Sequence, residues 1–140
     1  MKLSKNFSLE EMCGSNTARV RGLPNVPNAE QVNNLQQLCK NVLQPLRDHL
    51  GKPVVINSGF RSQAVNMAVG GANNSQHTKG EAADIKCKDL PFAKQIYAWI
   101  MDNLEFDQVI LERKGKAVWV HVSFRTNGKN RQQALTMLNA

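Results

Sequence analysis

The chain has 140 residues, of which 41% are apolar and 21% are charged, and its formal net charge is +7. This length suits one domain over residues 1–140, and the composition excludes a disordered tail, while no apolar run reaches the roughly 18 residues of a membrane-spanning helix. The positive charge favours polyanionic partners, but the basic residues are scattered, so charge alone does not choose between nucleic acid and an anionic cell wall.

The N-terminal segment and the cysteines bear on the cellular compartment. Residues 1–12 contain lysines but no apolar stretch behind them, so we expect no secretory signal and synthesis in the cytoplasm. Cys13, Cys39 and Cys87 are widely spaced and form no CxxC pair. This pattern predicts free thiols, and it indicates neither a disulfide framework nor a cysteine zinc site.

Two helices are predicted in the first third of the chain. Ser8 with Glu11 three residues later forms a capping box that opens a short helix. Asn28 caps a long helix that Gly51 ends. Its apolar residues recur at steps of three and four, which predicts one face packed in the core: Val32, Leu35, Leu38, Val42, Leu46 and Leu50.

Shorter elements follow the long helix. The β-branched run 53–58 predicts a buried strand, and 63–69 predicts a short helix. The stretch 70–75 is built from Gly and Asn, which tolerate positive φ, so it predicts a loop. Asp89 then caps a third helix that extends to about Leu104.

The last part of the chain predicts a β-hairpin, with strands at 107–112 and 117–124 joined by a four-residue turn at 113–116. The tail from Arg125 predicts a loop and a final helical turn near 132–138. Because helices come first and antiparallel strands follow, the expected fold is α+β, with a small antiparallel sheet flanked by helices in one compact domain.

Two of the three histidines lie in unusual surroundings. His121 is in the middle of the last strand, where alternation puts it on the same face as Trp119. Taken alone, it is more simply a packed strand histidine, and His77 a solvated loop histidine. However, His77 is followed by Gly80, two alanines and then Asp84, and such small residues let the chain turn and return as a strand.

Two imidazoles and one carboxylate are the usual donor set of a catalytic zinc site that keeps a position open for water. A metal in such a site can activate water to attack an amide. The pattern therefore indicates a metal cleft on the sheet, formed by His77, Asp84 and His121, although the spacing alone leaves the plainer interpretations open.

Three segments of the chain stand in a distinctive order and spacing: Ser58-Gly59-Phe60-Arg61-Ser62, Ser75-x-His77-x-x-Gly80-x-Ala82-x-Asp84 and Trp119-Val120-His121-Val122. Together they resemble the signature of the zinc D-alanyl-D-alanine carboxypeptidase family. That family includes carboxypeptidases, D,D-dipeptidases and phage endolysins that cut L-alanyl-D-glutamate bonds. The opening 7–11, the loop 25–27 and the helix end 43–47 also fit, so the resemblance covers most of the chain.

The resemblance implies a hedgehog-like zinc peptidase fold with Zn²⁺ held by His77, Asp84 and His121. It also implies that Arg61 holds a substrate carboxylate, a task that suits the paired donors of a guanidinium. The alternative is that Arg61 pins its own turn.

Two neighbours of His77 are further candidates for contact with the substrate. Ser75 would bind the substrate backbone, although it could equally order its own loop. Gln76 is a weaker candidate, for polarising the carbonyl of the bond that is cleaved.

The position that usually supplies the general base in this family is not acidic in this chain. Many relatives have Glu or Asp three residues before the last histidine ligand, and here this position is Val118. Glu112, which closes the preceding strand, is the candidate catalytic carboxylate instead, and Glu81 is held in reserve. The alternative for Glu112 is a surface charge at the end of the hairpin.

The expected hairpin register bears on the role of Glu112. A four-residue turn would pair Glu112 with Ala117 and Gln108 with His121. Glu112 would then lie two pairs away from the histidine ligand, unless a bulge draws it closer.

The sequence therefore predicts a zinc metallopeptidase that hydrolyses a peptide bond in peptidoglycan stem peptides, as a carboxypeptidase or as an endopeptidase of the endolysin type. A non-catalytic peptidoglycan-binding module is the alternative, motivated by Val118, and a nucleic-acid binder rests on charge alone. We expect a monomer with no nucleic-acid or membrane partner, which would reach the cell wall through phage-type lysis.

Overall fold

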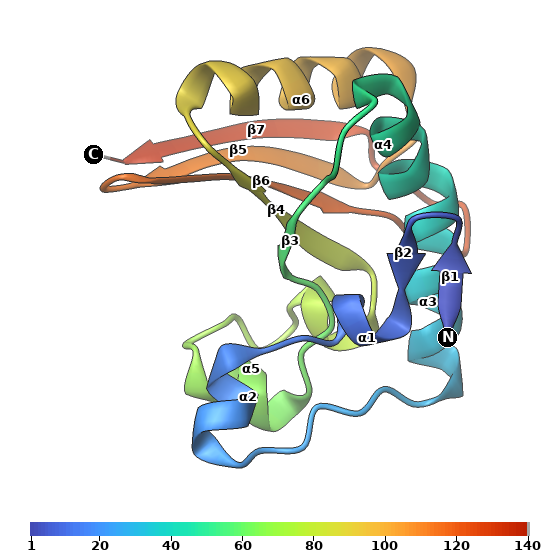
Figure 1. Cartoon of the computed structure of the whole chain (residues 1–140), viewed down its shortest axis with the longest axis vertical. Helices are drawn as coiled ribbons and strands as arrows, with labels where there is room; N and C mark the ends of the chain where they lie inside the picture. The colour runs from blue at the N-terminus through green and yellow to red at the C-terminus, as the bar shows by residue number, and fades with distance from the viewer. Residues whose placement is uncertain (140) are drawn as a thin grey trace.

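The computed structural model describes residues 1–139, and its centre is a five-stranded sheet in the order β3-β4-β6-β5-β7 (Figure 1). The strands are β3 (Ile56–Ser58), β4 (Ala82–Cys87), β5 (Gln108–Lys114), β6 (Ala117–Ser123) and β7 (Gln133–Asn139). Neighbouring strands run antiparallel, except that β7 runs parallel to β5. The predicted α+β class is confirmed, and the sheet is mixed rather than wholly antiparallel.

Helices and a small hairpin surround this sheet (Figure 1). The hairpin and the short helices are β1 (Lys2–Ser4), β2 (Phe7–Ser8), α1 (Leu9–Met12), α2 (Asn16–Arg21), α5 (Gln63–Ala68) and the 3₁₀ helix η2 (Gln76–Lys79). The longer helical elements are α3 (Ala29–Leu38), the π-helical η1 (Cys39–Leu43), α4 (Gln44–Leu50) and α6 (Leu90–Asn103).

The long helix predicted from Asn28 to Gly51 is present as the consecutive segments α3, η1 and α4. Asn28 and Gln31 form a reciprocal capping box at its start, and Gly51 ends it with a φ of 67°. Most of the predicted apolar face is fully buried in the core, namely Leu35, Leu38, Val42 and Leu46. This helix therefore supplies one wall of the core against which the sheet packs.

Strand alternation separates a core face of the sheet from an opposite, polar face. Ile85 on β4 and Val120 on β6 are buried together with Ile96 and Ile100 of α6, which lies along the core face (Figure 1). Residues one step along each strand, such as Asp84, point to the opposite face. The candidate site therefore lies on the side of the sheet away from α6.

The helical turn predicted near 132–138 is wrong, because this stretch forms β7. Ala, Leu and Met favour helices on their own, but pairing along the full length of β5 outweighs that local preference. The loop 124–132 leaves the end of β6 and passes the start of β5 to reach β7. Since β7 is antiparallel to β6, this short loop suffices without a crossover helix.

Three smaller predictions concerned the strand 53–58, the cysteines and membrane-spanning helices. Only Ile56–Ser58 of the predicted strand 53–58 is in the sheet. The cysteines are free, and burial raises the pKa of the Cys39 thiol to about 12. Within residues 1–139, none of the helices combines the length and the apolar character that crossing a bilayer requires.

Candidate metal centre

The three predicted metal ligands come together on the polar face of the sheet. Asp84 on β4 lies directly opposite His121 on β6, and η2 brings His77 above them. One ligand atom from each residue lies within 4.8 Å of the others. The side chains are largely covered, with exposed fractions of 4% for His77, 15% for Asp84 and 14% for His121.

Short-range sequence features place His77 beside Asp84. The hydroxyl of Ser75 accepts a hydrogen bond from the His77 main-chain N–H and caps η2. Gly80 ends η2 with a φ of 76°, a conformation that favours glycine, and the chain then enters β4. This tight turn lets a histidine and an aspartate seven positions apart face the same point.

The ring of His77 is oriented by a main-chain oxygen. Its Nδ1 lies 2.7 Å from the carbonyl oxygen of Gly59, so Nδ1 is the donor and Nε2 is the ring nitrogen left to face the site. That Nε2 lies 3.4 Å from Oδ2 of Asp84. A single metal ion could be bound by both atoms.

His121 faces the same carboxylate through its other ring nitrogen. Its Nδ1 lies 2.9 Å from Oδ1 of Asp84, and the two imidazole rings meet edge to face with centroids 5.2 Å apart. Burial opposes the charged form of Asp84, but hydrogen bonds and positive charge from His121 and His77 keep its pKa below the ordinary value. Asp84 is therefore a carboxylate, the form that binds a metal.

The donor set fits zinc. Two ligand atoms bound tetrahedrally to one zinc ion lie about 3.3 Å apart, close to the separations of Asp84 from the two histidines. The hydrogen bond from Nδ1 to Gly59 is the kind of outer-shell contact that fixes a histidine ligand.

Arg61 lies beside this cluster, immediately after β3. Its Nε donates to Ser58 Oγ at 3.2 Å, its Nη1 donates to Asn66 Oδ1 at 3.0 Å, and its Nη2 lies 3.8 Å from Asp84 Oδ2. The guanidinium is thus held in place by its own turn, as the plainer interpretation has it. It also lies beside Asp84, and the role that the resemblance implies, holding a substrate carboxylate, stays a prediction.

Ser75 and Gln76 are also near the ligands. The Ser75 hydroxyl is engaged in capping η2, which is the loop-ordering arrangement, while the residue also lines the cleft. The Gln76 amide nitrogen faces two carboxylates, Asp107 at 3.0 Å and Glu81 at 3.3 Å. Its N–H groups are therefore directed toward the protein, and its amide oxygen is the atom left for a ligand.

The predicted hairpin register is wrong by two residues, which changes the position of Glu112. The turn contains only Gly115 and Lys116, and the φ of 61° at Gly115 suits a two-residue hairpin turn. Glu112 therefore pairs with Trp119 rather than Ala117, and Ile110 rather than Gln108 lies opposite His121.

The observed register places Glu112 on the same face as His121 and one step diagonal to it. The half-buried carboxylate accepts a hydrogen bond from Trp119 Nε1 at 3.1 Å. Burial, together with the negative charge of Asp84, raises the pKa of Glu112 above its ordinary value. A bulge is not needed to bring this carboxylate toward the ligands.

Comparison with known proteins agrees with this geometry. A family model described as Peptidase M15 matches residues 5–123, which include all three candidate ligands, Arg61 and Glu112. The chain belongs to the peptidase M15 family. It is also 52% identical over 44 residues to the zinc D-Ala-D-Ala carboxypeptidase of Streptomyces albus G, a match that covers 31% of this chain and 17% of that relative. In an M15 family member, this donor set indicates zinc as the cofactor.

An open polar cleft of about 600 Å³ in this M15 family member is lined by one of the candidate ligands, His121. His121, Ser75, Gln76 and Gln108 line it, together with three basic residues and one acid, namely Lys79, Arg125, Arg131 and Glu81. The basic residues make the cleft electropositive, which suits an acidic ligand.

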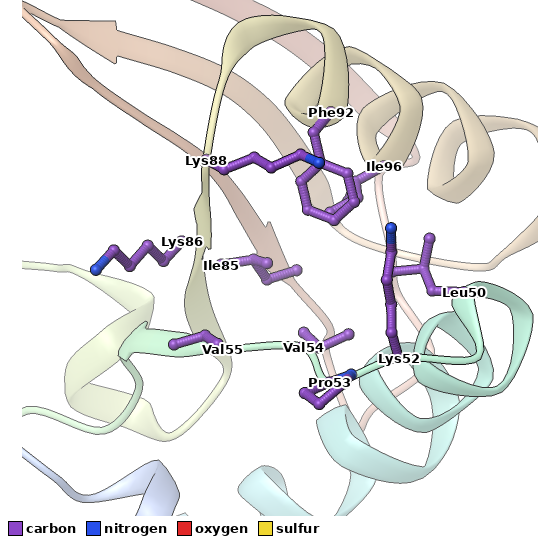
Figure 2. A pocket seen from close by; sticks show the side chains of 10 residues that line it. All are labelled: Leu50, Lys52, Pro53, Val54, Val55, Ile85, Lys86, Lys88, Phe92 and Ile96. Atoms are coloured by element: carbon purple, nitrogen blue, oxygen red, sulfur yellow. The ribbon is translucent and has the colours of Figure 1, made fainter.

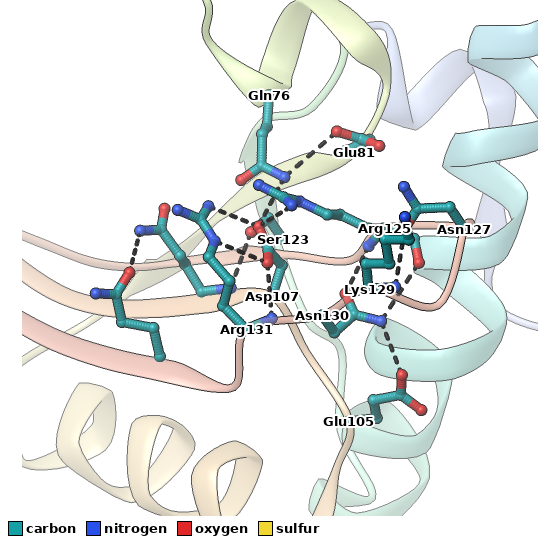
Figure 3. A network of polar contacts seen from close by, with 12 residues as sticks. Gln76, Glu81, Glu105, Asp107, Ser123, Arg125, Asn127, Lys129, Asn130 and Arg131 are labelled. Atoms are coloured by element: carbon teal, nitrogen blue, oxygen red, sulfur yellow. Dashed lines mark hydrogen bonds and ion pairs between the residues drawn. The ribbon is translucent and has the colours of Figure 1, made fainter.

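A network of hydrogen bonds and ion pairs centred on Asp107 lies behind this cleft (Figure 3) and was not predicted from the sequence. Asp107 is fully buried and contacts Arg125, Arg131 and Gln76. These partners lie 18 to 31 positions away in the sequence. The basic residues are scattered along the sequence, and no local pattern indicates a buried carboxylate partner for them.

A second cavity, of about 360 Å³, is lined mainly by apolar side chains between the end of α4, β4 and α6 (Figure 2). The ammonium groups of Lys52 and Lys88 lie 5.0 and 5.6 Å from the centre of the Phe92 ring. The described residues that line it include no histidine, cysteine or carboxylate. This cavity therefore offers no candidate metal ligand among the described residues.

Proposed function

We propose that the protein is a zinc metallopeptidase that hydrolyses a peptide bond in peptidoglycan stem peptides, acting as a monomer. The observation that carries this proposal is the convergence of His77, Asp84 and His121 beside an open cleft, in a member of the peptidase M15 family. The name of its relative from Streptomyces albus G supports both the metal and the class of substrate.

The proposed zinc ligands are Nε2 of His77, a carboxylate oxygen of Asp84 and Nδ1 of His121. When bound, zinc supplies a Lewis acid that polarises an amide carbonyl and lowers the pKa of water. The protein's own contribution is to hold these donors rigidly, with Gly59 fixing the His77 ring.

Glu112 is the proposed general base. Its raised pKa brings it nearer to neutrality, where a carboxylate can both accept and return a proton. We propose that Glu112 accepts a proton from the attacking water and passes it to the leaving amine, while Trp119 Nε1 fixes the carboxylate. Glu81 is the reserve for this role, although it accepts a hydrogen bond from Gln76.

Arg61 is the proposed anchor for a substrate carboxylate. Ser58 and Asn66 hold its Nε and Nη1, so that its remaining donors lie toward the Asp84 side of the site. Ser75 and Gln76 are proposed to contact the substrate backbone. Because the Gln76 N–H groups face carboxylates, we expect its oxygen to accept a hydrogen bond from a substrate N–H rather than to polarise the carbonyl.

Purified stem peptides and intact murein test the proposal. We expect the zinc-loaded protein to release products that mass spectrometry can identify, chelation to stop cleavage, and added zinc to restore it. The products also decide between removal of a terminal residue and cleavage within the peptide. Cleavage that survives chelation would refute the metal mechanism, and murein binding without product at full zinc occupancy would favour the non-catalytic alternative that Val118 motivates.

A further inference from the structure

The carboxylate of Asp107 is surrounded by nitrogen donors (Figure 3). The main-chain N, Nε and Nη2 of Arg131, Nε2 of Gln76 and Nε of Arg125 all lie 3.1 Å or less from its oxygens. The side chain has no exposed surface. Despite burial, the hydrogen bonds and charges of the arginines lower the pKa of Asp107 to about 2. Asp107 is therefore a fixed anion and is unsuited to act as a general base.

The fold places both arginines at the cleft through the loop that joins β6 to β7. Arg125 lies at the start of the loop 124–132 and Arg131 lies near its end, and the loop passes the first residues of β5, where Asp107 lies. The loop is closed by further contacts, including Arg125 N–H to Asn130 Oδ1 at 2.7 Å. Both guanidinium groups therefore have defined positions before any ligand binds.

This arrangement leaves positive charge and hydrogen-bond donors unused. Two guanidinium groups share one carboxylate, so the cluster carries a net charge of +1. Among residues 1–139, no protein acceptor bonds to Nη1 or Nη2 of Arg125 or to Nη1 of Arg131. The side chains of Arg125 and Arg131 are 33% and 45% exposed, and both line the cleft that contains His121. One arginine would be enough to neutralise the buried carboxylate of Asp107.

The pair lies across the site from Arg61. In the sheet order, Arg61 follows β3, Asp84 is on β4, His121 is on β6, and Asp107 precedes β5. Arg61 approaches Asp84, whereas Arg125 and Arg131 approach Asp107, and the two sets line different cavities. The metal ligands thus lie between two separate groups of guanidinium donors.

We propose that Arg125 and Arg131 form a second carboxylate-binding site, which recognises an acidic residue of the peptide substrate on the side of the cleaved bond away from Arg61. This inference rests on the proposed function and deepens it, because it assigns the specificity for an acidic peptide to residues beyond the matched stretch 5–123. A forked guanidinium binds a carboxylate with two parallel hydrogen bonds and charge. A peptide with carboxylates on both sides of the cleaved bond is therefore the preferred ligand.

A matched pair of stem peptides tests this site, one with the carboxylate of its acidic residue free and the other with that carboxylate amidated. Binding is measured by titration calorimetry on zinc-loaded Glu112→Gln protein, so that turnover does not interfere. We expect the free acid to bind about tenfold more tightly than the amide, as for a charge-assisted pair of hydrogen bonds. Adding Arg131→Gln should remove this preference and leave affinity for the amidated peptide within about twofold.

Further variants separate recognition from a purely structural role. Arg131→Lys keeps the charge without the fork and should restore part of the preference, whereas Lys114→Gln, an equal charge change at the exposed far end of β5, should leave it intact. If Arg131→Gln fails to fold, Arg125→Gln gives the same test, since its side chain contacts Asp107 only through Nε.

Two results would overturn the site: equal binding of both peptides by the Glu112→Gln protein, or an equal loss for both peptides in the arginine variants. The second result would mean that the pair only fastens the loop 124–132. Cleavage by the zinc-loaded wild-type protein is scored separately. Failure to cleave either peptide counts against the proposed function, while the binding preference still decides whether the carboxylate site exists.

Discussion

The carbonyl oxygen of Gly59 accepts a hydrogen bond from Nδ1 of His77 at 2.7 Å, and the α-carbon of the same glycine lies against the main chain of Met12. A methyl group at position 59 would overlap the Met12 carbonyl. Gly59 therefore contacts helix α1 on one side and orients the candidate metal ligand His77 on the other. Because Met12 is held in the core, the glycine has no room to give way.

We predict that Gly59→Ala lowers the stability by roughly 1–3 kcal/mol and weakens zinc binding by about tenfold or more, since the displaced carbonyl no longer orients His77. Thermal unfolding and competition with a chromogenic chelator measure the two effects. Gly14→Ala is the matched control, because its new methyl group would have only ordinary contacts, the nearest at 3.5 Å. Unchanged zinc affinity in Gly59→Ala would contradict the proposed role of the carbonyl.

Glu112→Gln should lower kcat by about a hundredfold or more while leaving zinc content and KM nearly unchanged, as expected for loss of a general base. Steady-state kinetics on the stem peptide that the enzyme cleaves best gives both constants. Glu30→Gln removes an equal charge from an exposed glutamate at the start of α3 and should behave like the wild type. If Glu112→Gln keeps full kcat, the base is another group, with Glu81 the next to test.

The surroundings of the same carboxylate predict the direction in which its pKa is shifted. A base must be unprotonated, and the pKa of Glu112 is raised by burial and by the charge of Asp84. In the zinc-free protein, an NMR titration of the Glu112 side chain should therefore give a pKa above the ordinary glutamate value, and added zinc should lower it, because the ion reverses the effect of the Asp84 charge. A Glu112 pKa at or below the ordinary glutamate range in the zinc-free protein would contradict this environment for Glu112.

Asp107 should make the fold sensitive to acid. Its pKa is lowered to about 2 from the ordinary value of 3.8, so its stabilising effect is fully present above pH 3.8 and is lost as the pH falls toward 2. The loss is on the order of 2 kcal/mol. Urea unfolding at pH 5 and pH 2 should show a smaller acid-induced loss in Asp107→Asn than in the wild type, and equal losses would rule out this contribution.

The convergence of His77, Asp84 and His121 could be predicted from the sequence because its signals are local or lie within one strand. The spacing of His77 and Asp84 around Gly80 specifies a tight turn into a strand, and alternation in β6 puts His121 on the polar face. The long helix and α6 were predictable for a similar reason, since caps and apolar periodicity both act over a few residues.

The remaining features depend on pairing between distant segments. The register of the hairpin follows from where Gly115 falls in the turn, and moving it by two residues brings Glu112 toward His121. β7 has a composition that suits a helix and becomes a strand only through its pairing with β5. The contacts of Asp107 with Arg125 and Arg131 depend in turn on the path of the loop before β7, so no local pattern reveals them.

Zinc analysis of purified variants tests the central claim most directly. The wild type and His49→Ala should each contain one zinc ion per chain, because His49 stacks on Trp99 with ring centres 4.4 Å apart and is no part of the cluster. His77→Ala and His121→Ala, checked for folding by circular dichroism, should retain less than about a tenth of that zinc after dialysis. Full zinc occupancy in both folded variants would contradict a metal site formed by His77, Asp84 and His121.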